Sequence, residues 1–443
     1  MPVVSLSRLV SSGDSKALAR YDGYVESVEA LATAALAGQW SVRSSEPALD
    51  GAPGRALVAS VPVATRRSVG AFFTSGTMRD DAFRVLLPRT VGERAALDPA
   101  CGAGDLLLAW TQCLPVARGL GATLRLWEPL IRGVDIHESF VRLARARLVI
   151  AAAARSPYVK ADVPDLDETF RALTVGSGPD RMLREGVPNW TMMNPPFGRV
   201  AAPPSCEWAT GAVSEAAAFV DSYLSAAKPG QRLVAILPDV LRTGATLRAW
   251  RECVQRMAVI EVIQPLGQFN RDVDIDVFVL RLRRARTATR NAVWWAPAVR
   301  RGRVPVSSVA TVRVGTVVPH RDPKKGQFVP FLHAQNLARR AIASTPVEKR
   351  RYAGPLFVPP FIAIRRTSRP GDRPRALATV VTGTSSIAVE NHLLVVTPKK
   401  QSMAACRRLA QELMEPRASQ WLDQRLRGRH LTVTALNELT VRS

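Results

Sequence analysis

The sequence predicts an α/β fold with a mainly parallel seven-stranded sheet, followed by a second domain of different composition. Three observations support this prediction. Apolar runs of strand length alternate with helical periodicities up to about residue 285. A glycine-rich loop joins the first of these strands to a helix, as in doubly wound nucleotide-binding folds. Beyond that point the chain becomes proline-rich, basic and rich in β-forming residues.

The chain divides by composition into three predicted parts: a helical N-terminal segment (1–64), the α/β domain (65–285) and a basic domain (286–443). In the first part the pattern predicts a helix over 24–36, and clustered Pro and Gly predict a loop over 44–54.

Seven apolar segments are predicted as the strands of the sheet, with helices between them. The strands are expected at residues 94–99, 131–136, 159–163, 189–193, 232–238, 259–263 and 274–282. The helices are expected at residues 78–87, 106–110, 139–154, 214–227 and 249–257. In the basic domain we expect strands within 327–332, 354–366, 377–381 and 392–397, and closing helices at 402–413 and 418–426.

The stretch Asp-Pro-Ala-Cys-Gly-Ala-Gly-Asp at 98–105 follows the first strand. Gly102 and Gly104 lack a Cβ, so the loop can turn tightly and bring its backbone close to a ligand. The spacing matches neither the dinucleotide fingerprint nor the P-loop. Asp98, which leads the loop, suits a cofactor with a cationic sulfonium and an ammonium better than a pyrophosphate. The alternative is an ordinary strand-to-helix turn.

The stretch Asn194-Pro-Pro-Phe197 ends the apolar run 189–193 abruptly. Two prolines stiffen the segment and cannot extend a sheet. The side-chain oxygen of Asn194 and the carbonyl of Pro195 are then free to accept hydrogen bonds. A planar NH2 group has two N–H donors and needs two acceptors, and Phe197 offers a flat face for a base. The pattern therefore indicates a clamp for a planar amine; the alternative is a plain proline turn.

Two further acids end predicted strands, Asp135 in Gly-Val-Asp and Asp162 in Lys-Ala-Asp. In doubly wound folds the acid after the second strand lies where a ribose binds. Taken alone, each acid is better explained as a helix cap. Their repeated position at strand ends favours a role in a cofactor site.

The net charge of +24 is unevenly spread, because residues 286–443 hold 28 Lys and Arg against 8 Asp and Glu. This excess of 20 positive charges is typical of a phosphate-binding surface and predicts nucleic acid as a partner. Arginine-rich composition from a GC-rich genome is the alternative, but it does not explain the concentration in one third of the chain.

Other features narrow the class of protein. No apolar run reaches membrane-span length, and no convincing signal peptide opens the chain, so we expect neither a membrane partner nor secretion. Five scattered cysteines without CxxC spacing indicate neither a zinc site nor a disulfide framework and fit a reducing cytoplasm. We therefore expect a cytoplasmic protein with no metal site.

The order of these motifs resembles the γ arrangement of adenine-N6 DNA methyltransferases of restriction–modification systems. The order is Phe73-Thr74, then the Asp98 loop, then Gly133-x-Asp-Ile, then Asn194-Pro-Pro-Phe, then a basic domain. The resemblance covers residues 66–285 by motif, and the paired core motifs are specific. A looser likeness links 328–336 and 360–366 to the target-recognition domain of that family.

The resemblance implies a Rossmann-like methyltransferase domain that uses S-adenosylmethionine, and it implies site residues one by one. Thr74, Asp98, Cys101, Gly102 and Gly104 would line the methionine end of the cofactor. Asp135 would bind the ribose, Ile136 would contact the adenine ring, and Asp162 would bind the adenine amine. Asn194, Pro195 and Pro196 would form the clamp, and Phe197 would stack on the target base. Ser75 stands where the family usually has Pro, and Phe197 where Tyr is commoner.

The expected function is methyl transfer from S-adenosylmethionine to N6 of an adenine flipped out of a specific site in double-stranded DNA. A restriction or defence-system subunit is an expected further partner. Two alternatives stay open. The same clamp serves methyltransferases that act on guanine N2 in RNA or on a glutamine amide in protein. A non-catalytic DNA-binding subunit on a methyltransferase fold is the other.

Overall fold

The computed structural model describes residues 19–39, 48–69, 94–157, 163–203, 206–269, 275–286, 294, 302–337, 342–343, 346–426 and 428–442. Thr74, Asp162 and the predicted helix 78–87 lie outside these ranges, so their predictions stand untested. By its internal contacts the chain forms two compact units, residues 1–292 and 293–443, and each is described by itself.

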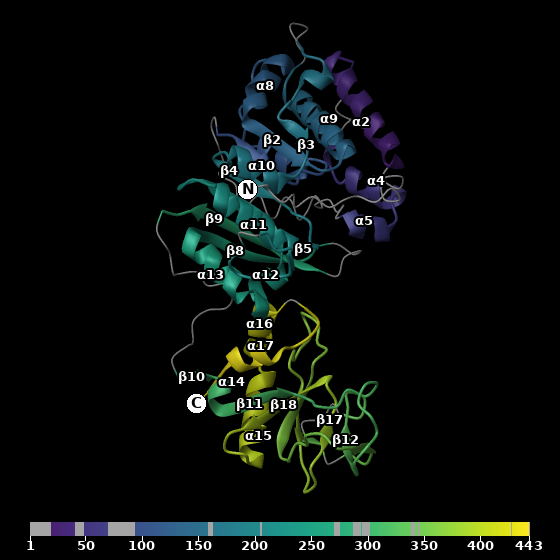
Figure 1. Ribbon diagram of the computed structural model, residues 1–443, viewed down its shortest axis with the longest axis vertical. Coiled ribbons are helices and arrows are strands. Elements are labelled where there is room, and N and C mark those ends of the chain that lie inside the picture. The colour runs from purple at the N-terminus through teal and green to yellow at the C-terminus, as the bar shows by residue number, and fades with distance from the viewer. Residues whose placement is uncertain are drawn as a thin grey trace. The chain divides into compact units, whose positions relative to one another are not determined.

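The first unit is built on a seven-stranded sheet with the order β3-β2-β1-β4-β7-β9-β8 (Figure 1). Strands β1 to β4 and β7 pair in parallel, and β9 pairs antiparallel with both β7 and β8. This confirms the mainly parallel α/β fold. The strands are β1 (Ala96–Asp98), β2 (Ile131–Asp135), β3 (Leu173–Val175), β4 (Trp190–Met193), β7 (Arg232–Pro238), β8 (Ala258–Gln268) and β9 (Asp276–Arg284).

The third strand differs from its prediction. The place beside β2 is taken by β3, Leu173–Val175, whereas the pattern placed this strand at 159–163. Of that range, only Val163 is described, and it is not in a strand. The reason is that β3 has just three residues, with Val175 54% exposed, so its local sequence gives almost no strand signal.

Two groups of helices cover the sheet. One group packs around α9 (Glu138–Arg155) and contains α7 (Asp105–Thr111), α8 (Leu120–Trp127) and α2 (Asp22–Leu36). The other group is built around α11 (Glu215–Ala226), with α10 (Gly178–Glu185), α12 (Asp239–Thr243) and α13 (Arg248–Met257). The predicted helices at 106–110, 139–154, 214–227 and 249–257 are therefore confirmed.

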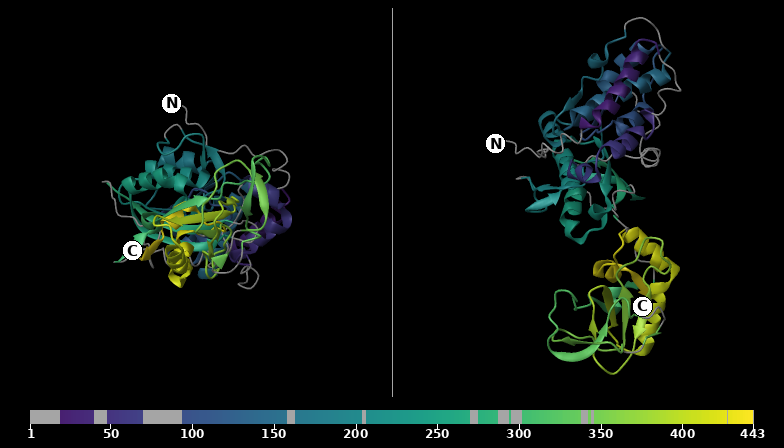
Figure 2. Two further views of the ribbon diagram at one scale, coloured as in Figure 1. Left: turned by 90° about the horizontal axis from the view of Figure 1, so that it is seen from below. Right: turned by 90° about the vertical axis from the view of Figure 1, so that its right-hand side faces the viewer.

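The N-terminal helices form an outer layer on α9. Helix α2 lies along α9 (Figure 1, and the purple helix in the right-hand view of Figure 2), and its buried valines share one hydrophobic core with α9 and the sheet. Helices α4 (Ala52–Ser60) and α5 (Val63–Val69) follow. The loop predicted over 44–54 ends earlier, because α4 already starts at Ala52. Pro53 lies in its first turn, where the missing N–H of proline costs no helical hydrogen bond.

The second unit contains a five-stranded sheet in the order β11-β18-β15-β16-β13 and a three-stranded sheet in the order β14-β12-β17. The strands of the first are β11 (Ala310–Val314), β13 (Ile342–Ala343), β15 (Phe361–Arg365), β16 (Ala378–Val381) and β18 (Leu393–Pro398). Those of the second are β12 (Gln327–Leu332), β14 (Lys349–Tyr352) and β17 (Ala388–Val389). Helices α15 (Met403–Met414), α16 (Pro416–Arg425) and α17 (Val433–Glu438) pack on one face of the larger sheet.

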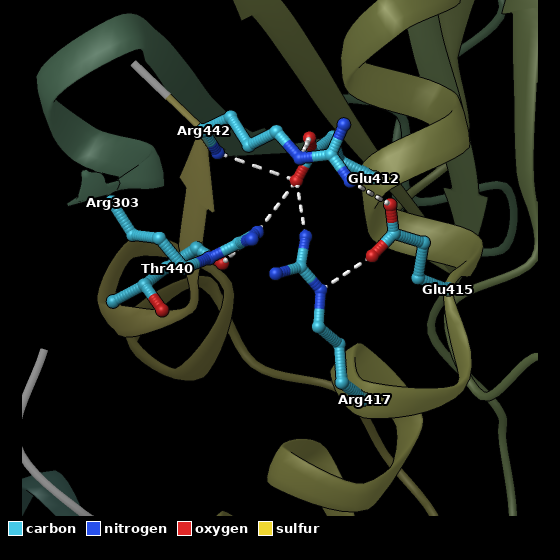
Figure 3. A network of polar contacts seen from close by, with 6 residues as sticks. All are labelled: Arg303, Glu412, Glu415, Arg417, Thr440 and Arg442. Carbon is cyan, nitrogen blue, oxygen red and sulfur yellow. Dashed lines mark hydrogen bonds and ion pairs between the residues drawn. The ribbon is translucent and has the colours of Figure 1, made fainter. Parts of the chain in front are cut away.

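The two ends of this unit are joined. Strand β10 (Arg303–Pro305) pairs antiparallel with the last strand, β19 (Thr440–Arg442). Beside this pair, the carboxylate of Glu412 on α15 binds Arg303 and Arg417, each at 2.6 Å, and Arg442 at 3.3 Å (Figure 3). Glu415 binds Arg417 and Arg442 in turn. The cluster therefore holds the first strand, the last strand and the α15–α16 corner together.

Among the described residues, no helix has both the length and the apolar character that a membrane span requires.

Candidate cofactor and target-amine site

The sequence motifs meet at the carboxyl edge of the sheet. In parallel register, Leu97 of β1 pairs with Thr191 of β4, and Asp98 pairs with Gly133 of β2. Asp98, Asp135 and Asn194 therefore all lie at the ends of three adjacent strands. The chain reverses its direction of strand addition between β1 and β4, and ligands of open α/β sheets bind at such a switch point.

The loop after β1 has the conformation that its glycines predict. Gly102 and Gly104 adopt φ angles of +50° and +83°, which favour glycine. The backbone N–H of Cys101 donates to the carbonyl of Val134 at 2.9 Å. The N–H of Gly102 donates to the Asp135 carboxylate, also at 2.9 Å. The loop is thus tied to the end of β2, where the predicted ribose-binding acid stands.

Helix α9 limits the room behind this loop. A Cβ added at Gly104 would lie 3.0 Å from the Cβ of Ala144 and 3.3 Å from its Cα. On the other side, a Cβ at Gly178, the first residue of α10, would meet the Pro99 carbonyl oxygen at 1.8 Å. The loop therefore passes closely packed between α9 and the start of α10.

Two carboxyl groups of the site are held in poorly solvated surroundings. Asp98 is 1% exposed, and burial raises its pKa well above the ordinary value, against a hydrogen bond from the N–H of Ala100. Burial likewise raises the pKa of Asp135, opposed by His137 and by backbone N–H groups. Among the described residues, no lysine or arginine is ion-paired with either.

This charge pattern can be tested against S-adenosylmethionine, the cofactor that the motifs imply. Two carboxyls, Asp98 buried and Asp135 partly exposed, have no lysine or arginine partner among the described residues, and they suit a ligand that brings its own positive charge, since ionisation then gains a counter-charge. The residues present therefore fit a ligand with a sulfonium and an ammonium group. Cys101 is buried beside them, and burial raises the pKa of its thiol well above the ordinary value, so it remains a neutral lining residue.

The segment Asn194–Phe197 leaves the sheet directly at the end of β4. Pro195 is buried, and the other three are partly exposed. A short hairpin follows, β5 (Arg199–Ala201) with β6 (Ala212–Ser214). The N–H of Glu215 donates to the Gly198 carbonyl at 3.0 Å. These contacts fix the segment at its far end, so that it projects from the sheet edge as a rigid bend.

Sequence reasoning missed two residues beside the site. Phe269, which follows β8, is buried, and its ring packs edge-on against Phe197 with centroids 5.2 Å apart. Asp180 is the first acid after the observed third strand; it lies two residues after Gly178, which packs against Pro99 of the loop, and its Oδ1 atom is buried. Neither residue has a local signal, because tertiary packing brings Phe269 to Phe197 and the start of α10 to the loop. Had the third strand been predicted to end at residue 175, Asp180 would have been the next acid along the chain and so a candidate for the site.

The remaining predicted residues have simple locations. Ile136 follows Asp135 directly and is partly exposed. Thr74 and Asp162 lie outside the described residues. In the part of the chain that the structure describes, no group of three or more His, Cys, Asp or Glu side chains could hold a metal ion.

Comparison with known proteins defines the fold. Neither a protein-family model nor a curated protein sequence matches the chain. Among solved structures, the type IIL restriction-modification enzyme MmeI in complex with DNA matches with a TM-score of 0.54 and 12% identity. The match covers 88% of this chain and 70% of that one. At this identity the likeness shows the fold alone, an α/β fold with a mainly parallel sheet.

Two further neighbours have lower scores. A class I S-adenosylmethionine-dependent methyltransferase from Listeria monocytogenes has a TM-score of 0.38 and 16% identity, covering 64% of this chain and 92% of that one. A modification subunit assigned to a type I restriction enzyme from Vibrio vulnificus has a TM-score of 0.37 and 17% identity, covering 62% and 53%. The chain thus spans about half of that subunit.

Proposed function

We propose that this protein transfers a methyl group from S-adenosylmethionine to N6 of an adenine flipped out of a specific sequence in double-stranded DNA. The observation that carries the proposal is the convergence of three motifs at one sheet edge. Asp98 with its glycine loop, Asp135 and the Asn194–Phe197 segment end three neighbouring parallel strands.

The cofactor end of the proposed site consists of the loop and the two acids. Asp98 would bind the ammonium end of the ligand, where a cation stabilises its ionised form. Asp135 would accept hydrogen bonds from ribose hydroxyls while retaining the N–H of Gly102, because each carboxylate oxygen accepts more than one bond. Thr74 and Asp162 remain candidates from the family resemblance. Asp180 joins them as a candidate for the adenine amine.

The target end would act by positioning. The side-chain oxygen of Asn194 and the carbonyl of Pro195 would accept the two N–H bonds of the amine and concentrate electron density on its nitrogen. Phe197, held edge-on by Phe269, would stack on the base, and Pro196 would keep the bend rigid. When bound, S-adenosylmethionine supplies an electrophilic methyl group on a sulfonium. Asn194 and Pro195 would hold the amine while its nitrogen took this methyl group, leaving a neutral thioether, and the methylated amine would release one proton to water.

The charge of the second unit supports DNA as the partner. All eight acidic side chains of residues 286–443 already have a hydrogen-bond or ion-pair partner within the unit. They are Asp322, Glu348, Asp372, Glu390, Glu412, Glu415, Asp423 and Glu438. These acids are therefore engaged inside the unit, and the excess of 20 positive charges in this part remains. Such a surface suits a phosphate backbone.

Within this unit, the β12–β14 pair offers the most suitable contact surface. Phe328 and Arg351 lie opposite each other in register, and the Arg351 guanidinium lies over the Phe328 ring at 4.7 Å. Phe328 is 63% exposed. Exposed Lys349 shares their face, since it pairs with Pro330 two positions along the ribbon. A two-stranded ribbon fits the major groove, where cations reach phosphates and guanine, and an apolar ring contacts thymine methyl groups.

A transfer assay with tritiated S-adenosylmethionine tests the substrate class. Purified full-length protein is offered unmethylated bacterial genomic DNA, ribosomal RNA and a protein extract in separate reactions. We expect label in DNA, recovered as N6-methyladenine after digestion to nucleosides. Label in guanine of RNA or in glutamine would replace the proposed substrate with one of the alternatives. Cofactor binding without transfer to any of the three would favour a non-catalytic subunit.

The DNA surface has its own test. Fluorescence anisotropy with duplex DNA compares Arg351→Ala with Lys400→Ala, which removes the same charge from an exposed site at the end of β18. We expect the first variant to weaken binding by about tenfold or more, and the second by less than about threefold. Equal losses would mean that charge alone binds DNA and that the ribbon has no special role.

A further inference from the structure

Arg147 is a fully buried arginine on α9 that links two backbone stretches far apart in the sequence. On one side, its Nη1 atom donates to the carbonyl of Ala103 at 2.5 Å and pairs with the Asp105 carboxylate at 3.0 Å. On the other side, its Nε atom donates to the carbonyl of Ala48 at 2.7 Å, and its Nη2 atom donates to that of Asp50 at 3.4 Å.

A buried arginine is stable only if its charge and its N–H donors are compensated. A guanidinium stays charged in proteins, so burying it requires a counter-charge and acceptors for its donors. Asp105 supplies the charge, and its side chain is only 10% exposed. The acceptors come equally from the loop and from the N-terminal segment. Arg147 can therefore occupy its place only when both stretches are docked on α9.

On the loop side, Arg147 contacts the two residues that flank Gly104, Ala103 and Asp105. Ala144, one turn before Arg147 on α9, lies against Gly104 itself. Helix α9 therefore contacts three consecutive residues of the loop. Since Gly102 in the same loop donates to Asp135, a shift at residues 103–105 would move the backbone that approaches the ligand.

The same helix holds the N-terminal layer by contacts that do not reach the loop. Arg142 binds Glu29 of α2 with two hydrogen bonds of 2.9 and 2.5 Å. Ser139 donates to Asp22 at 2.5 Å. Docking of the N-terminal layer and support of the loop therefore depend on different residues of α9 and can be separated by substitution.

We infer that Arg147 is a positioning residue for the cofactor loop, and that through it residues 48–50 of the N-terminal segment form part of the support of the cofactor site. The inference rests on the proposed function in one respect, that the loop at 98–105 holds S-adenosylmethionine. It gives the N-terminal segment, for which the sequence indicates no chemistry, a role in cofactor affinity.

Calorimetric titration of the full-length protein with S-adenosylmethionine tests this inference. Arg147→Met removes the guanidinium at similar volume. We expect it to raise the dissociation constant for S-adenosylmethionine at least tenfold. Arg142→Met is the matched control, because it removes an arginine from the same helix that contacts the same N-terminal layer but not the loop; we expect less than a twofold change. In steady-state kinetics the KM for S-adenosylmethionine should rise in Arg147→Met, while the KM for DNA stays unchanged.

A second variant covers the case in which Arg147→Met fails to fold, since it leaves Asp105 buried without a counter-charge. The double variant Asp105→Asn with Arg147→Met removes both charges together, and it should fold while losing the restraint on the loop. We expect the same tenfold loss of affinity. Affinity equal to wild type in this double variant would overturn the inference.

The other outcomes separate the inference from the proposed function. If the wild-type protein does not bind S-adenosylmethionine, the proposed cofactor is wrong. If the wild type binds and Arg142→Met loses as much affinity as the Arg147 variants, general docking of the N-terminal layer is responsible and the specific role of Arg147 is refuted, with the proposed function intact.

Discussion

The contact between Gly104 and α9 allows a quantitative prediction about the loop. In Gly104→Ala, the new Cβ has two costs. An alanine at φ +83° costs about 1–2 kcal/mol for the left-handed conformation. A Cβ 3.0 Å from that of Ala144 is much tighter than an ordinary van der Waals contact, so α9 would have to shift slightly, and overpacking of this kind costs about 1–3 kcal/mol. Together the two costs amount to about 2–5 kcal/mol of destabilisation in Gly104→Ala, before the change in the unfolded chain is counted.

Gly230 provides the matched control. It has a φ of +95° in the Lys228–Gln231 turn, which the N–H of Gln231 closes by donating to the Lys228 carbonyl at 3.2 Å, and an added Cβ meets nothing within 4 Å. Gly230→Ala therefore has the backbone cost alone, about 1–2 kcal/mol. The reduced freedom of the unfolded chain offsets about 0.5–1 kcal/mol in both variants and cancels in their difference. We expect the two variants to differ by about 1–3 kcal/mol.

Urea denaturation followed by tryptophan fluorescence measures this difference, because Trp110, Trp127 and Trp190 are buried in the first unit and report its unfolding. The linear dependence on urea gives a free energy for each variant. A difference below about 0.5 kcal/mol, the usual size for an uneventful surface change, would refute the close packing of the loop on α9.

Three further predictions concern the clamp, the buried acid and the second unit. Asn194→Ala should lower the rate of methyl transfer at least about 100-fold, as the removal of a positioned hydrogen-bonding group typically does. Its affinity for S-adenosylmethionine, measured by calorimetry, should not change. The control is Asn189→Ala, which replaces an exposed asparagine just before β4 and should keep full activity. Because burial raises the pKa of Asp98, the folded protein holds this proton more tightly than the unfolded chain. That stabilisation is complete below the ordinary carboxyl pKa of about 4 and is lost as the pH rises through the folded value. The thermal midpoint of the wild type relative to Asp98→Asn should therefore fall as the pH is raised from 4, and parallel curves would contradict the burial of this group. Glu412→Gln should lower the free energy of unfolding of the second unit, measured in urea, by about 1–3 kcal/mol. The loss is smaller than for a fully buried pair because two of the arginines that Glu412 binds are at least partly exposed. Arg442→Ala, which removes a side chain that is 72% exposed, should lower this free energy by at most about 1 kcal/mol.

The central strands of the first unit were predictable from the sequence for a physical reason. Strands β4 and β7 are buried along almost their whole length, so they are continuous apolar runs, as parallel central strands must be. The glycines of the loop were predictable because positive φ angles restrict the residue type. The apolar runs and the glycines both depend only on residues that are adjacent in the chain, so a single sequence is enough to predict them.

Other parts depend on contacts distant in the sequence. Strand β3 is defined by its pairing with β2 more than by its three residues, so the pattern placed the third strand too early. The burial of Arg147 has no local signal, because the carbonyls of Ala48, Asp50 and Ala103 that accept its hydrogen bonds lie far from it in the sequence. The contact of Phe269 with Phe197 is likewise made only by the folded sheet.

The central claim is methyl transfer to adenine N6 in DNA, and the modified bases in a living cell test it most directly. The wild-type chain and Asn194→Ala are each expressed in a bacterial host without DNA methylation, and the genomic DNA is sequenced for modified bases. We predict N6-methyladenine at one short sequence motif with the wild type and none with the variant. Methylated cytosine in place of adenine, or adenine methylation that persists in Asn194→Ala, would contradict the account.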